Sequence, residues 1–163
     1  MANFDDHIRQ AKGNLSILSE FNNKIANGWD WQVTIAYYIA VHLMNAHLAK
    51  KANLHYKTHE QVKNALFSAT SVGKIPEDVY LSYVKLEGLS RRSRYLCHEN
   101  NAGLESLPYL TYDKHFKKAL KNLDRILKFF DGEYKISFKA INIDCIEVKD
   151  DKLIYFNYLK KTV

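Results

Sequence analysis

Apolar side chains recur every three or four residues along most of this chain. The first such stretch contains Ile8, Ala11, Leu15, Leu18, Phe21 and Ile25. This spacing is the period of a helix that buries one of its faces. The chain has only six Gly and two Pro residues, so few positions interrupt such helices. We therefore expect long helices packed side by side, the first of them ending near Asn27 and Gly28.

Two further helices are expected before residue 70. The second begins near Asp30, whose carboxylate can cap a helix, and its wide apolar face continues to about Lys51. Thr58 and Gln61 have the spacing of a capping box, in which the two side chains satisfy backbone N–H groups of the first turn. A short third helix is therefore predicted to begin at this point.

A fourth and a fifth helix complete the expected bundle. Pro76 suits the first position of a helix, and the two acidic residues that follow it favour the positive end of the helix dipole. This helix runs into a basic segment that begins at Arg91. Asp113 is placed to cap the fifth helix, and Gly132 is expected to end it. The fold class predicted for this part is mainly α, a bundle of four to five helices.

The apolar pattern changes after residue 132. Short stretches rich in Ile, Val, Phe and Tyr surround the polar sequence Lys149-Asp150-Asp151-Lys152. Such stretches favour strands, and the polar sequence favours a turn. We expect residues 1–132 to form the helical bundle, and residues 133–163 to form a short β-hairpin or three-stranded appendage packed on the same domain.

Length and composition indicate one globular domain. A chain of 163 residues is long enough for a single hydrophobic core, and Cys97 and Cys145 alone do not form a disulfide framework. The most apolar stretch, residues 33–44, is far shorter than the roughly 20 residues that span a bilayer. We therefore expect a cytoplasmic protein without membrane contact. The net charge of +6 is compatible with a polyanionic partner.

The most informative segment is basic and ends in a histidine. It places three guanidinium groups, those of Arg91, Arg92 and Arg94, close to the imidazole of His98. Arginine matches phosphate oxygens with a planar fork, and histidine exchanges protons near neutral pH. Cleavage of RNA at the ribose 2′-OH requires such a base and such a cation. A solvated basic helix end remains the alternative interpretation.

The chain resembles the HEPN superfamily, the nucleotide-binding helical domains of higher eukaryotes and prokaryotes. The resemblance covers about residues 5–130 and depends on the pair Tyr37-Tyr38, on Ala46-His47-Leu48-Ala49 and on residues 57–62. The family signature consists of an Arg, a polar residue, four variable residues and a His. Residues Arg92 to His98 match this spacing.

The resemblance implies a HEPN-like bundle that forms a homodimer, with the signature residues of both subunits in one cleft. It implies a metal-independent endoribonuclease, a toxin or defence effector with a cognate antitoxin or partner protein. Arg92 and His98 would be the catalytic residues, and Arg91 and Arg94 would bind RNA. Neither a metal nor another cofactor is expected.

Two other functions stay open. Ser93 follows Arg92, where active members of the superfamily usually carry Asn, His or Asp. The second hypothesis is therefore a non-catalytic HEPN module that binds a nucleotide, RNA or a protein partner. The third is a structural adaptor whose C-terminal β segment docks on another protein.

The other histidines and aromatic residues are assigned ordinary structural roles. His42 and His47 lie five residues apart, so they should point to different sides of a helix. His55 and His59 flank the Thr58 cap, and no cluster at ligand spacing completes a zinc site around them. Aromatic residues at helical spacing, such as Tyr37, are expected in the core.

Overall fold

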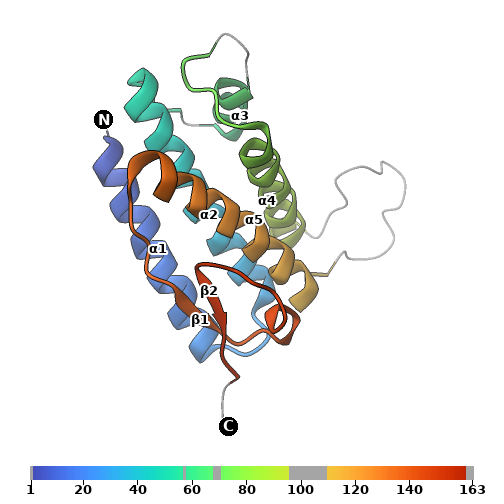
Figure 1. Cartoon of the computed structure of the whole chain (residues 1–163). Coiled ribbons are helices and arrows are strands. Elements are labelled where there is room, and N and C mark those ends of the chain that lie inside the picture. Colours follow the sequence, from blue (N-terminus) through green and yellow to red (C-terminus); the bar gives the residue numbers. More distant parts are fainter. Residues whose placement is uncertain (1, 57, 68–70, 96–109, 161–163) are drawn as a thin grey trace.

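The computed structural model describes residues 2–56, 58–67, 71–95 and 110–160. It confirms the mainly helical fold class with a small β element near the C-terminal end. Figure 1 shows the helices side by side, with α5 in orange crossing the front of the bundle. The helices in chain order are α1 (Phe4–Lys24), α2 (Trp29–Ala52), α3 (His59–Phe67), α4 (Glu77–Tyr95) and α5 (Asp113–Tyr134).

Helix α2 lies at the centre and packs against α1, α4 and α5. The apolar faces predicted from the three-to-four spacing meet here. Leu18 of α1, Met44 of α2 and Leu86 of α4 are all completely buried. Burial of a leucine side chain contributes about 1.5–3 kcal/mol, so this shared core holds the bundle together. The two residues of the Tyr37-Tyr38 pair differ in burial, because Tyr37 is buried and Tyr38 is 39% exposed.

Several helix boundaries differ from the prediction. Helix α2 begins at Trp29 and has Gly28 as its N-cap, so Asp30 lies inside the first turn. Helix α5 already includes Asp113, and it continues past Gly132 to Tyr134. The chain stops being helical at Lys135, which takes a left-handed conformation with φ 56°.

The Thr58 cap is present. Its hydroxyl accepts a hydrogen bond from the backbone N–H of Gln61 at 3.3 Å, and α3 begins one residue later, at His59. Helix α1 ends at Lys24, three residues before the predicted end, and the backbone of Asn27 is left-handed with φ 59°. The connection from α1 to α2 is therefore a short turn.

The predicted β-hairpin is wrong in its pairing. Strand β1 (Ile141–Ile143) pairs in parallel with β2 (Phe156–Tyr158), with Ile141 opposite Phe156. Parallel strands need a crossover, and residues 144–155 supply it, including a 3₁₀ turn at Ile146–Val148. Val148 is buried in this crossover and the 3₁₀ turn packs on α5, so the turn near residue 150 does not join two neighbouring strands.

Side-chain hydrogen bonds fasten the C-terminal segment to the bundle. The carboxylate of Asp124 on α5 accepts from the backbone N–H groups of Ile154 and Tyr155, both at 2.9 Å. The amide oxygen of Asn22 on α1 accepts from the backbone N–H of Asp144 at 2.8 Å. Within the described ranges, no helix is both long enough and apolar enough to cross a bilayer.

Candidate functional site

The end of α4 carries the three arginines of the basic segment, and they point in different directions. Successive side chains on a helix are rotated by about 100°. Arg91 is exposed, Arg92 is buried and Arg94 is half-buried. The structure therefore does not gather the three guanidinium groups on one surface. His98 lies outside the described residues, so the geometry of the predicted Arg92–His98 pair is not described.

Arg92 connects α4 to the segment that enters α5. Its side chain is 7% exposed, and its Nε donates a hydrogen bond to the carbonyl oxygen of Leu110 at 3.0 Å. A terminal nitrogen of the same guanidinium donates to that oxygen as well. A buried guanidinium requires such partners, because an unpaired buried charge is strongly destabilising. The residue therefore has a structural role in this conformation.

The neighbours of Arg92 extend this connection. The Ser93 hydroxyl lies 3.0 Å from that of Thr111, and it also donates to the carbonyl oxygen of Leu89 at 2.9 Å. His115 Nδ1 accepts from the backbone N–H of Tyr112 at 3.0 Å and caps the first turn of α5. Burial, with the nearby charge of Arg92 as the next cause, lowers the pKa of His115 to about 4. His115 is therefore a neutral acceptor at neutral pH.

Arg94 lies on aromatic rings. Its guanidinium carbon is 5.1 Å from the ring centre of Tyr95 and 6.0 Å from that of Tyr37. Tyr37 is completely buried, whereas Tyr95 is 64% exposed. A guanidinium over an aromatic face is attracted by the ring quadrupole. The half-buried Arg94 and the exposed Tyr95 thus form a cation and aromatic pair at the end of α4.

A polar cluster lies behind this pair, between α2, α3 and α4. The ring of His59 packs on Tyr37 with 5.2 Å between the ring centres, and Lys63 forms an ion pair with Glu87 at 2.9 Å. Burial lowers the pKa of His59, while the carboxylate of Glu87 opposes this shift and the charge of Arg94 adds to it. The cluster therefore combines a neutral imidazole, a carboxylate and a cation.

Sequence reasoning missed this cluster. The signal was available on α4, because Glu87 and Arg94 are seven residues apart and share a helix face. The contribution of His59 was not readable from spacing, since α3 is brought against Tyr37 only by the fold. The acidic partner and the histidine of the cluster thus come from separate helices.

Three further histidines meet at another place. His7 Nδ1 lies 3.2 Å from His42 Nδ1, and His7 Nε2 lies 3.1 Å from His55 Nδ1. His7 uses opposite ring nitrogens for its two neighbours, so the three rings cannot converge on one ion. Among the residues that the structure describes, no three His, Cys, Asp or Glu side chains are arranged to hold a metal.

His47 has different partners from His42, as the spacing predicted. Its Nε2 donates to the carbonyl oxygen of Gly73 at 3.0 Å, and its Nδ1 lies 2.6 Å from the Tyr134 hydroxyl. Burial lowers the pKa of His47. This histidine therefore connects α2 to two distant parts of the chain and is structural.

The HEPN resemblance remains a prediction based on the sequence motifs. In the comparisons with known proteins, no family model, no curated protein and no solved structure matches this chain.

Proposed function

We propose that this protein is a non-catalytic RNA-binding module of HEPN type that binds single-stranded RNA at the end of α4. The proposal depends on one observation, the difference in burial among the three arginines. Arg92 is buried against the carbonyl oxygen of Leu110, while Arg91 and the Arg94–Tyr95 pair remain at the surface. The surface groups are therefore available to bind RNA. The guanidinium of Arg92, the predicted catalytic cation, is instead engaged in a structural hydrogen bond.

The chemistry of the exposed groups fits a single strand. Tyr95 is an aromatic residue with 64% exposure, and unpaired bases stack on such side chains. Arg94 polarises this ring and can contribute a cation–π contact to a stacked base. Arg91 is exposed and supplies a guanidinium group that can bind a phosphate group. The net charge of +6 favours a polyanion such as RNA over a protein partner that has few acidic residues.

The test is a titration of fluorescently labelled single-stranded RNA with the wild type and with Tyr95→Ala. A stacked base contributes about 1–3 kcal/mol, so the Kd should rise by roughly 5-fold to 150-fold. Trp31→Ala is the matched control, because Trp31 is an aromatic residue with 61% exposure on another helix. Equal affinities for wild type and Tyr95→Ala would contradict the proposal.

The second candidate function is a metal-independent endoribonuclease, favoured by the spacing from Arg92 to His98. His98 would act as general acid or base, and Arg92 would stabilise the scissile phosphate after exchanging the Leu110 carbonyl for a phosphoryl oxygen. A homodimer would bring two such pairs into one cleft. A toxin or defence role with a cognate antitoxin belongs to this candidate.

An RNA cleavage assay in EDTA separates the two candidates. A nuclease of this kind leaves a 2′,3′-cyclic phosphate, spares substrates with a 2′-deoxy at the cleavage site and loses about 10²- to 10⁴-fold in rate with His98→Ala. The binding module shows RNA binding without cleavage under the same conditions. If the wild type cleaves RNA and His98→Ala does not, the binding-module proposal is refuted and the endoribonuclease is supported.

A further inference from the structure

Helix α5 carries a straight row of cations on its outer face. The row consists of Lys114, Lys118, Lys121, Arg125 and Lys128, and all five side chains are exposed. Their spacing of four and three residues keeps them on one side of the helix. With a rise of 1.5 Å per residue, the row is about 21 Å long. We call it the α5 basic row.

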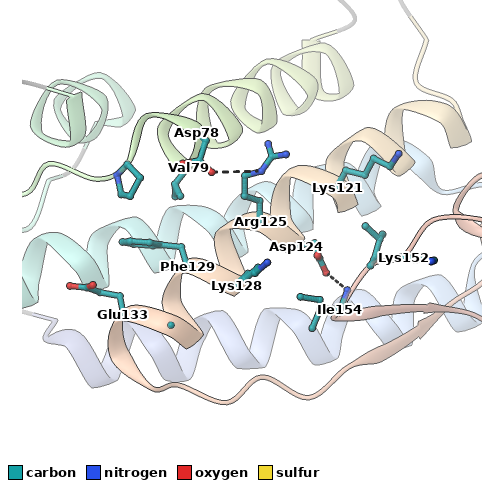
Figure 2. A pocket seen from close by; sticks show the side chains of 13 residues that line it. Asp78, Val79, Lys121, Asp124, Arg125, Lys128, Phe129, Glu133, Lys152 and Ile154 are labelled. Carbon is teal, nitrogen blue, oxygen red and sulfur yellow. Dashed lines mark hydrogen bonds and ion pairs between the residues drawn. The ribbon is translucent and has the colours of Figure 1, made fainter.

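The second half of the row forms the floor of an open groove. Figure 2 shows Lys121, Arg125 and Lys128 on α5, with the start of α4 on one side and the segment around Ile154 on the other. The groove has a volume of about 880 Å³. Lys152 lines the same groove from the C-terminal segment, so cations reach it from two elements.

The acidic side chains that line the groove already have hydrogen-bond or ion-pair partners. The carboxylate of Asp124 accepts two backbone N–H groups, and Glu133 forms an ion pair with Lys51 at 2.7 Å. Asp78 lies 4.0 Å from Arg125. These contacts reduce the negative potential that the three carboxylates would otherwise exert on an incoming anion.

Several of the cations, by contrast, lack an acidic partner. Within the described part of the chain, Lys114, Lys118, Lys128 and Lys152 form no ion pair, whereas Lys121 is paired with Asp151 at 2.8 Å. The positive end of the α5 dipole lies beside Lys114 and adds to the potential there. Among the described residues, Lys114, Lys118 and Lys128 of the row thus have no acidic partner, whereas Lys121 and Arg125 each have one.

We propose that the α5 basic row and the groove hold the phosphate backbone of a single RNA strand. This inference rests on the proposed RNA binding and names a second contact surface for it. At about 3.4 Å per nucleotide, a row of about 21 Å accommodates about six stacked nucleotides. Site sizes of about 4–16 nucleotides are usual for grooves that follow a single strand.

The row continues from the end of α4. Arg92 and Ser93 contact Leu110 and Thr111, immediately before α5 begins. A strand whose base stacks on Tyr95 therefore has the first cation of the row nearby. The contacts of Arg92 and Ser93 bring the end of α4 close to the start of α5, where the row begins.

A membrane surface fits the row less well than RNA. Interfacial helices insert an apolar face between lipid headgroups. In α5 the apolar face is buried in the core, where Phe116, Leu120 and Leu127 are completely covered. The exposed face carries point charges in a line, which suits a linear polyanion.

The test uses a triple variant, Lys114→Gln, Lys118→Gln and Lys128→Gln, in which glutamine retains helix propensity and length. The control is Lys74→Gln, Lys85→Gln and Lys139→Gln, which removes the same charge from exposed lysines that do not line the groove. RNA affinity is measured across a salt series. Each lost phosphate contact releases about 0.7 fewer counterions, so the slope of log K against log salt should decrease by about 2 in the row variant. The control variant should retain the wild-type slope.

Inorganic polyphosphate, which has no bases, separates this inference from the proposed function. Loss of polyphosphate binding in the row variant, with binding retained by Tyr95→Ala, supports the α5 basic row even if the base site at Tyr95 fails. Equal slopes for the row and control variants would overturn the inference, because the effect would then be one of net charge. Binding to phosphatidylserine vesicles that is stronger than binding to RNA would overturn it as well.

Discussion

Replacing Arg92 by alanine removes the guanidinium that joins the end of α4 to Leu110. The hydrogen bonds come from a charged donor, and such bonds contribute about 1.5–3 kcal/mol. Leu110 is 46% exposed, so water can partly replace the lost donor at its carbonyl oxygen. We therefore expect the free energy of unfolding to fall by about 2 kcal/mol.

This loss is measurable as a shift in melting temperature. For a domain of this size 1 kcal/mol corresponds to about 2–4 °C, so Arg92→Ala should melt about 4–8 °C below the wild type in calorimetry. Arg91→Ala is the matched control, because Arg91 is exposed and should change stability by no more than about 0.5 kcal/mol.

The same pair of variants separates a structural from a binding role. Below the melting transition, Arg92→Ala should bind RNA almost as well as the wild type, whereas Arg91→Ala should bind more weakly and melt normally. Identical melting temperatures for the two variants would refute the structural assignment of Arg92. A large loss of RNA affinity in folded Arg92→Ala would refute it independently.

Three other predictions concern stability and assembly. The pKa of His115 is lowered from 6.5 to about 4, so the unfolded state binds the proton more readily, and this contribution to stability should be lost as the pH falls from about 6.5 towards 4. His115→Gln retains an acceptor for the cap, so denaturant unfolding at pH 7 and pH 5 should differ less in this variant than in the wild type. Asp124→Ala leaves the N–H groups of Ile154 and Tyr155 without their acceptor and should cost about 2–3 kcal/mol, seen as faster amide exchange at these two positions. The HEPN resemblance predicts a homodimer, and a monomer mass that stays constant across the micromolar range in sedimentation would contradict this prediction.

The helices were predictable because their apolar residues repeat locally. The faces that contain Leu18, Met44 and Leu86 are readable from spacing alone, and burial confirms each of these residues. Boundaries were less predictable. Gly132 was expected to end α5, but a single glycine inside a helix costs only about 1 kcal/mol, and the left-handed turn falls at Lys135 instead.

The candidate site was predictable only in its residue types. The sequence places Arg92 in a motif, but its partner Leu110 is 18 residues away and is selected by the fold. The strand pairing failed for the same reason, since the crossover between β1 and β2 depends on contacts with α5. The α5 basic row is visible in the sequence, whereas the groove beside it requires the positions of α4 and the C-terminal segment.

The hydrogen bond between Asn22 and Asp144 has a consequence for the order of folding. It joins positions 122 residues apart, whereas neighbouring helices of the bundle meet over much shorter loops. The entropy lost on closing a loop grows with its length, and contacts close in sequence form first. We therefore expect the helices to associate early and the C-terminal segment to dock last. The refolding rate should then change little when Asn22 is replaced by alanine, while the unfolding rate should rise. A contact that is absent from the transition state affects only the unfolding rate.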